Sequence, residues 1–300
     1  MNPFRVACLL PLFLFLLLLS GCTSGPAHAP RPRPERRTWL VVLDLSDRLL
    51  LHGQATRDTA LVGAVARQFL AQVALARYIG SADRLRVVVA PQAGQAARVD
   101  SLREDLTVDM AALPVNQRRE APARVAALLA RVGRLYAAAQ AGRRRSADFA
   151  GTDLWHYFRD QLPADLRGAG ALDTAYRCRH SVVVLTDGYF DFEDFRGRRV
   201  QGHRYASTAF VPQLARLGAA WADTLRAGRY GLLPIALPAP LGATTTVTVA
   251  EVNPRSEYED DILATVWADW LRAAGVQTPP RLLLQATPLT SIREQLVAAP

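Results

Sequence analysis

The chain has 300 residues, half of them hydrophobic, so it can bury a large core and is neither a disordered nor a fibrous protein. Its formal net charge is +9, and all of its basic side chains other than histidine are arginines. The basic runs at 31–37, 118–119 and 143–145 contain no aromatic residues, which favours solvated loops, near anionic lipid headgroups, over a nucleic-acid interface.

The first residues have the layout of an export signal. Arg5 precedes an apolar run at 7–19, and the small residues Ser20 and Gly21 then lead to Cys22. The run has about 13 residues, whereas a membrane-spanning helix needs roughly 20. We therefore expect residues 1–21 to be a cleaved signal peptide. The ending at Cys22 resembles the lipobox of bacterial lipoproteins, and this resemblance implies that Cys22 becomes the first mature residue and carries a diacylglycerol.

Residues 22–38 follow as a tether rich in proline and arginine, which favours an extended chain. No acidic residue stands directly after Cys22. By resemblance to lipoprotein sorting, this predicts an outer-membrane anchor with the body facing the periplasm rather than the cell surface. Removal of Cys8 and acylation of Cys22 leave Cys178 as the last thiol, so the body is expected to have no internal disulfide.

The remaining residues, 39–300, alternate between strand and helix patterns, as a single domain does. Buried strands are predicted at 39–43, 85–89, 106–110, 181–186, 230–237 and 244–252. Helices are predicted at 58–78, with Asp58 as its cap, from Pro122 to Tyr136, from Gly151 through Phe158, at 210–225, and from Ile262 to a stop at Gly275. This order predicts an α/β fold, with a doubly wound, mainly parallel sheet covered by helices on both faces.

Oxygen-bearing side chains follow three of these segment boundaries. Asp44 and Ser46 come after the first strand, Thr152 opens a helix, and Asp187 ends the strongest strand. Ligand groups in such sheets gather beyond the carboxyl ends of the strands, so we expect these four side chains to meet. Two carboxylates and two hydroxyls are a donor set for a hard cation such as Mg²⁺.

These motifs resemble the von Willebrand factor type A family, which carries an Asp-x-Ser-x-Ser loop, a later threonine and a Thr-Asp-Gly turn. The resemblance implies a Rossmann-like fold over roughly residues 39–275. It also implies a metal-ion-dependent adhesion site, with Asp44, Ser46, Thr152 and Asp187 as ligands and a protein partner completing the coordination. Arg48 stands where the family has its second serine. Its guanidinium either enters the pocket, on Asp44 or Asp187, and competes with the cation, or turns away to Asp47 or the acidic residues Asp191 and Asp194.

Three functions stay open at this point. The first is a lipid-anchored envelope module without catalytic residues that binds a protein partner through this site. The second is a metal-assisted hydrolase that uses Asp44 and Asp187 with His180 nearby. The third is an envelope scaffold whose adhesion site is inactive. His180 precedes the strand that Asp187 ends, so we expect it at the opposite edge of the sheet, which argues against the hydrolase.

Overall fold

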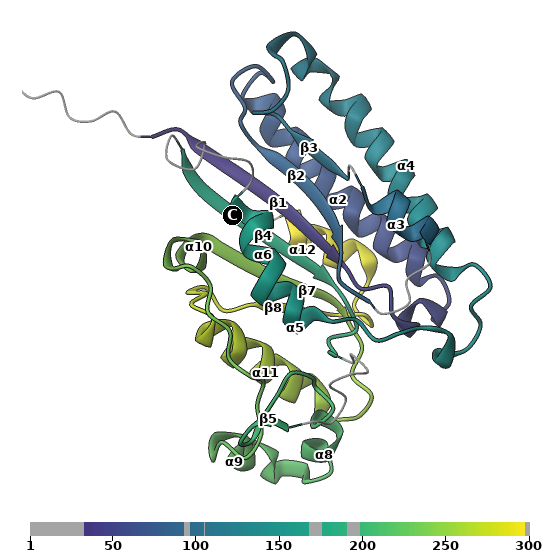
Figure 1. Ribbon diagram of the computed structural model, residues 1–300, viewed down its shortest axis with the longest axis vertical. Coiled ribbons are helices and arrows are strands. Elements are labelled where there is room, and N and C mark those ends of the chain that lie inside the picture. The colour runs from purple at the N-terminus through teal and green to yellow at the C-terminus, as the bar shows by residue number, and fades with distance from the viewer. Residues whose placement is uncertain (1–32, 93–96, 105, 168–175, 191–198, 298–300) are drawn as a thin grey trace, which may run out of the picture. The chain divides into compact units, whose positions relative to one another are not determined.

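The computed structural model describes residues 33–92, 97–104, 106–167, 176–190 and 199–297. Residues Glu35–Pro300 form one compact unit, which is called the body below. Its strands are β1 (Glu35–Leu43), β2 (Arg84–Val89), β3 (Thr107–Asp109), β4 (Arg177–Leu185), β5 (Arg199–Gln201), β6 (Arg204–Tyr205), β7 (Thr245–Val252) and β8 (Arg281–Leu284). Its α-helices are α2 (Gln54–Leu75), α3 (Ala97–Arg103), α4 (Ala121–Gln140), α5 (Leu154–His156), α6 (Leu162–Arg167), α8 (Val211–Ala215), α9 (Trp221–Arg226), α10 (Ala239–Thr244), α11 (Glu259–Ala273) and α12 (Leu289–Val297). Figure 1 shows their arrangement.

A six-stranded sheet in the order β3-β2-β1-β4-β7-β8 forms the centre of the body. All neighbouring strands pair in parallel except β2 and β3, which are antiparallel. The predicted α/β class with a mainly parallel sheet is therefore confirmed. β5 and β6 form a separate two-stranded sheet.

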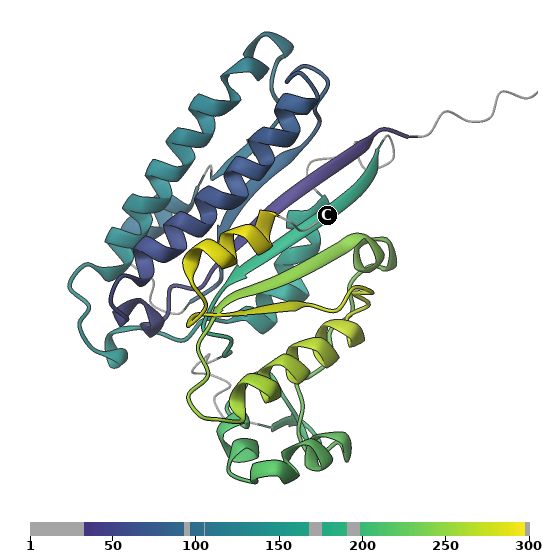
Figure 2. The ribbon, with the colours of Figure 1, turned by 180° about the vertical axis from the view of Figure 1, so that it is seen from behind.

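Alternate residues of the central strands enter two separate cores, one on each face of the sheet. On β1, Leu40 and Val42 join a core covered by α5, α6, α8 and α11, and Val41 and Leu43 join a core covered by α2, α4 and α12. Figures 1 and 2 show these two helical layers from opposite sides. A strand buried on both faces explains the unbroken apolar runs of the sequence, and full burial of each Leu or Val contributes about 1.5–3 kcal/mol.

Several predicted elements differ in the structure. Asp58 does not cap a helix, because α2 begins at Gln54 and Asp58 lies inside it, fully buried. The helix predicted at 210–225 is two helices, α8 and α9, separated near Gly218, whose φ is 53°. Around Leu232 a single bridge to Tyr205 replaces the strand predicted at 230–237, because Pro234 cannot donate to a ladder.

The signal peptide, Cys22 and the tether as far as Pro32 lie outside the described residues, as do Asp191 and Asp194. Among the helices that the structure describes, none has both the length and the apolar character that a membrane crossing needs.

Candidate functional site

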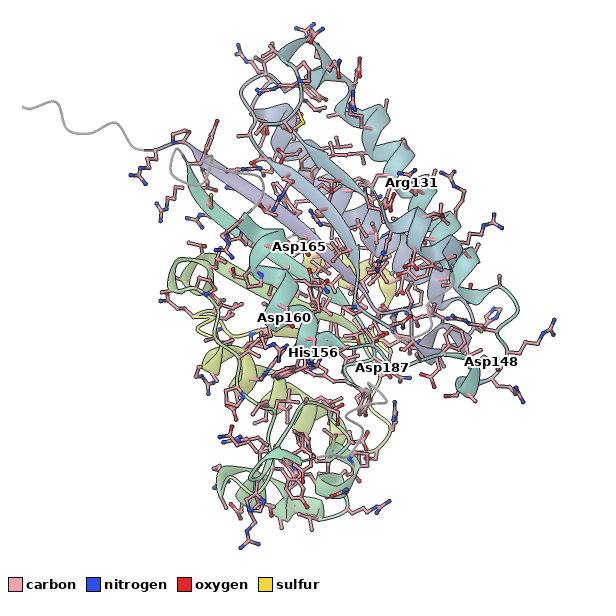
Figure 3. The ribbon with its side chains drawn as sticks, viewed as in Figure 1. Arg131, Asp148, His156, Asp160, Asp165 and Asp187 are labelled. Atoms are coloured by element: carbon pink, nitrogen blue, oxygen red, sulfur yellow. The ribbon has the colours of Figure 1, made fainter. Side chains whose placement is uncertain are left out.

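The four predicted oxygen ligands line one pocket of about 300 Å³ at the carboxyl edge of the sheet. Asp44 and Ser46 follow β1, Thr152 precedes α5, and Asp187 follows β4, where Figure 3 labels it. The hydrogen bonding between β1 and β4 continues one residue past the end of β1, where the backbone N–H of Asp44 donates to the Leu185 carbonyl (3.1 Å). This backbone bond fixes the two loops beside each other, as the common direction of β1 and β4 predicts.

Asp44 is fully buried, and both of its carboxylate oxygens accept hydrogen bonds. Oδ1 accepts from the backbone N–H of Ser46 (2.8 Å) and from the Thr152 hydroxyl. Oδ2 accepts from the Thr186 hydroxyl (2.7 Å). The carboxylate is therefore held in one orientation by three donors, and one lone pair on Oδ2 stays open.

Thr152 is brought to Asp44 from outside the sheet. The backbone of Thr152 forms an isolated antiparallel β-bridge with Gln92, just beyond the end of β2. The Thr152 hydroxyl also accepts a hydrogen bond from Gln92 Nε2 (2.9 Å). The backbone N–H of Asp153 donates to the Pro91 carbonyl (2.9 Å). The loop that carries Thr152 is thus tied to the β2 end, which explains how a residue 108 positions away in sequence reaches Asp44.

Asp187 is the less satisfied carboxylate. Its Oδ1 accepts from the backbone N–H of Tyr189 (3.1 Å), and Arg255 Nη2 lies 3.3 Å from Oδ2. Burial, and next the negative charge of Asp44, raise the pKa of Asp187 to about 7. The side chain of Arg255 is half exposed and lies over the Tyr189 ring, 4.0 Å from its centroid. Asp44 and Asp187 therefore repel each other at the pocket. The positive charge that contacts Asp187 is the guanidinium of Arg255 at the surface.

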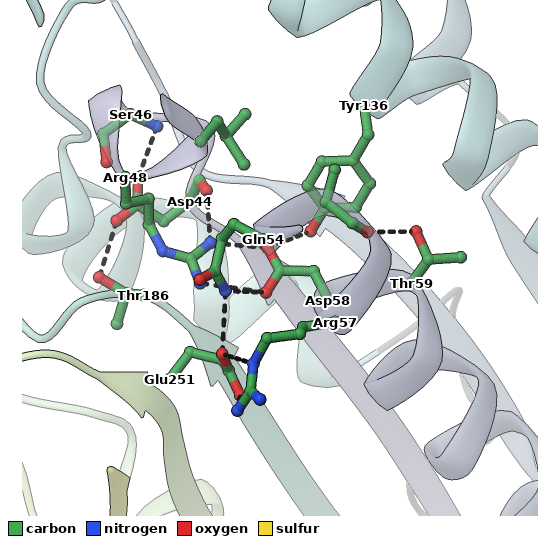
Figure 4. A network of polar contacts seen from close by, with 12 residues as sticks. Asp44, Ser46, Arg48, Gln54, Arg57, Asp58, Thr59, Tyr136, Thr186 and Glu251 are labelled. Carbon is green, nitrogen blue, oxygen red and sulfur yellow. Dashed lines mark hydrogen bonds and ion pairs between the residues drawn. The ribbon is translucent and has the colours of Figure 1, made fainter. Parts of the chain in front are cut away.

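Arg48 does not line the pocket and points away from it, as the second alternative expected, but its partner is none of the carboxylates named for it. It turns into the protein and forks onto Asp58 of α2, with Nη1 to Oδ2 at 2.7 Å and Nη2 to Oδ1 at 3.0 Å. Figure 4 shows this network. Burial disfavours its charge, but the attraction of Asp58 and its hydrogen bonds outweigh burial, so the pKa of Arg48 lies above its usual value. Its Nη1 also donates to the backbone carbonyl of Asp44 (3.2 Å), which supports the loop from behind.

The same network extends to β7. Gln54 Nε2 donates to Asp58 (2.8 Å) and to Glu251 (3.0 Å), and Arg57 forks onto Glu251 at 2.8 and 2.9 Å. Glu251 lies at a register shift between β7 and β8 and has a φ of 71°, a conformation that costs a non-glycine residue about 1–3 kcal/mol. The ion pair with Arg57 keeps Glu251 in this conformation, so the region beneath the pocket is linked from α2 to β7.

The chemistry of the pocket fits a hard cation. Its polar lining side chains are carboxylates and hydroxyls, and Asp44 and Asp187 repel each other, which a divalent cation would offset. Asp187 has free lone pairs, and Asp44, Ser46 and Thr152 could contribute directly or through water. In the part of the chain that the structure describes, no three side chains of the His, Cys, Asp and Glu types gather as ligands. A bound cation would therefore depend on hydroxyls, water or a partner.

The other candidate residues lie elsewhere. His180 is buried in the amino-terminal half of β4, seven residues before Asp187, or about 23 Å along a strand. His156 pairs with Asp153, the residue that caps α5. Trp155, Trp267 and Trp270 belong to the core, whereas Trp221 is only partly buried.

Thr186 and Arg255 complete the site, although the family motif does not include either as a ligand. Thr186 directly follows β4, and Arg255 lies in the turn after β7. Both positions are beyond the carboxyl end of a strand, so the rule that brought Asp44 and Asp187 together would have indicated them as well.

Comparison with known proteins gives little. No protein-family model matches the chain, and no curated protein sequence matches it. Among solved structures, the chain is similar to the pilus adhesin SpaC from Lactobacillus rhamnosus GG in its open conformation, with a TM-score of 0.40 and 12% identity. That match covers 89% of this chain and 29% of the adhesin, so the chain corresponds to less than a third of the adhesin's length.

Proposed function

We propose that the chain is a lipid-anchored, non-enzymatic interaction module of the cell envelope, with a von Willebrand A-like site that binds a protein partner through Mg²⁺. The observation that supports it most is the shared pocket of Asp44, Ser46, Thr152 and Asp187, which sequence motifs alone nominate as ligands. Asp187 would hold the cation directly, and Asp44 and the hydroxyls would orient it. A carboxylate of the partner would complete the coordination.

The absence of catalytic residues is part of this proposal. None of the described residues that line the pocket is histidine, cysteine or lysine, so no histidine base stands beside its serine and threonine hydroxyls. His180, the base that a hydrolase would use, lies in the amino-terminal half of β4, away from this pocket.

Calorimetric titration of Mg²⁺ into the body tests the site. We expect measurable binding that Asp187→Asn abolishes, because this variant removes the charge that the cation offsets. Asp269→Asn is the matched control, since Asp269 is an exposed carboxylate on α11 that pairs with Arg272 (2.7 Å). Heat of binding that is equal in Asp187→Asn and in the parent would place the cation elsewhere.

Two cell experiments test the anchor and the partner. With Cys22→Ala, we expect an unprocessed or soluble protein, and membrane retention at mature size would contradict lipidation of Cys22. Protease treatment of intact cells should leave the body undigested if it faces the periplasm from the outer membrane. A partner captured from solubilised envelope should be lost with chelator and with Asp187→Asn, but not with Asp269→Asn.

A further inference from the structure

The amino edge of the sheet carries a second pocket, of about 280 Å³, at the opposite end of the strands from the oxygen site. Its polar lining consists of arginines and hydroxyl-bearing residues together with Gln68 and His180, and no Asp or Glu is among the described residues that line it. The arginines are Arg37 of β1 and Arg177 and Arg179 of β4, and the hydroxyls include Ser181, Thr246 and Thr278. Guanidinium and hydroxyl donors together are the chemistry that binds phosphate groups.

The register of β1 and β4 places like charges side by side. Arg37 is directly opposite Arg179, and Glu35 is opposite Arg177. Glu35 is the carboxylate shared by the opposed pair, with 2.6 Å to Arg37 Nε and 3.2 Å to Arg179 Nε. The Arg37 backbone N–H also donates to Asp83 (2.8 Å), so three guanidinium groups stand against two carboxylates and positive charge is in excess. Like charges opposite each other in a sheet destabilise it, so this arrangement favours an anion that offsets the excess.

The position of the patch says where such an anion would come from. β1 begins at Glu35, so the segment that leads back to Cys22 joins the body at this edge. Only twelve residues, 23–34, separate Cys22 from Glu35, and a fully extended chain of that length spans at most about 43 Å. A lipid on Cys22 would therefore keep the amino edge within reach of the headgroups, and Arg31 and Arg33 add positive charge along the way.

We propose that Arg37, Arg177 and Arg179 form a docking surface for the phosphate-bearing headgroups of anionic lipids, which orients the body on its membrane. β1 has nine residues and is about 30 Å long. Docking at the amino edge would thus hold the oxygen site about 30 Å from the membrane, facing the space in which a partner is found. This inference rests on the membrane anchoring proposed above, but it requires no cation at the oxygen site.

Co-sedimentation with vesicles tests the surface. The chain from Thr23 onward lacks the acylated cysteine and keeps the whole compact unit Glu35–Pro300. We expect it to bind phosphatidylglycerol–phosphatidylcholine vesicles and not phosphatidylcholine alone, and to lose this binding in high salt. Arg177→Gln with Arg179→Gln should weaken binding by about 30-fold, or about fivefold for each arginine at the surface.

The control pair is Arg216→Gln with Arg229→Gln, which removes the same charge from exposed arginines outside the pocket and should change binding less than twofold. Circular dichroism verifies that both pairs fold. An equal loss in the two pairs would mean binding by overall charge, and no loss in the first pair would place the surface elsewhere; either result overturns the proposal.

A titration of inorganic phosphate separates the two sources of the anion. Loss of phosphate binding in the first pair with unchanged vesicle binding would assign the pocket to a soluble anion and would also overturn the proposal. Because the assay uses an unacylated chain without Mg²⁺, its outcome is independent of the Cys22 and Asp187 experiments. Failure of either proposal can therefore be recognised separately.

Discussion

Asp58→Asn is the substitution that tests the buried network most directly. Asp58 accepts four hydrogen bonds, two from Arg48, one from Gln54 at 2.8 Å and one from the Tyr136 hydroxyl at 3.0 Å. The side chains of Arg48 and Asp58 are 1% and 0% exposed. Asparagine keeps the shape of the side chain but removes its charge, so the Arg48 guanidinium would stay buried without a counter-ion. Breaking a buried pair in this way costs about 3–5 kcal/mol.

Urea unfolding followed by circular dichroism measures this cost. Asp160→Asn is the matched control, because Asp160 pairs with Arg159 at 2.6 Å but both side chains are nearly half exposed. Such a surface pair contributes about 0–1 kcal/mol. A loss of unfolding free energy from Asp58→Asn as small as that of the control would refute the inference that burial makes this ion pair essential.

A double variant separates the orphaned charge from other effects. Arg48→Met combined with Asp58→Asn removes both charges. The asparagine oxygen can still accept from Gln54, and its Nδ2 can donate to the Tyr136 hydroxyl oxygen, because these two partners contact different oxygens of Asp58. We expect the double variant to be more stable than Asp58→Asn alone, with a coupling energy of about 2–3 kcal/mol. If the two substitutions were additive, the loss in Asp58→Asn would come from the other donors rather than from Arg48.

Three further predictions concern pH, the cation and the turn. Burial first, then Arg84 and Arg36, lower the pKa of His180 from 6.5 to about 4. Between these two values the unfolded chain binds a proton that the folded chain does not, so the free energy of unfolding decreases as the pH is lowered. His180→Leu should therefore gain about 2 kcal/mol on the parent between pH 7 and pH 5 in urea unfolding, and a gap that does not change with pH would contradict this. Arg255→Gln should bind Mg²⁺ more tightly by calorimetry, because it removes a positive charge that competes with the cation for Asp187. The gain should be no more than about fivefold, since this contact is exposed. The control Arg272→Gln, at another exposed arginine, should not differ from the parent. Gly188→Ala should lose about 1–3 kcal/mol in thermal unfolding, since φ is 95° and the added Cβ would lie 3.0 Å from Val252 Cγ1, and a gain like that expected of Gly133→Ala in α4, which has open space, would refute the strain.

Much of the fold could be predicted from the sequence, because its signals are local. The apolar runs that became β1, β4 and β7 are buried on both faces, and that of β2 is buried on one face and partly on the other; such runs are recognisable without knowledge of their neighbours. The convergence of Asp44 and Asp187 could also be predicted, since it depends only on each residue being next to a strand end in a parallel sheet. The helix predicted at 210–225 failed because a single glycine with a left-handed backbone interrupts an otherwise helical pattern.

Side-chain partners were decided by the tertiary structure alone. Arg48 has Asp47 beside it in the sequence, yet it pairs with Asp58, because the short helix after β1 turns its side chain toward α2 and away from the pocket. Arg255 approaches Asp187 across 68 positions for a comparable reason, namely the place of the turn after β7 beside the end of β4. Local sequence patterns indicate which elements form and which side chains follow their ends. The partner of a long, flexible arginine depends instead on the strand order and on how the helices cross the sheet, and no local pattern encodes either.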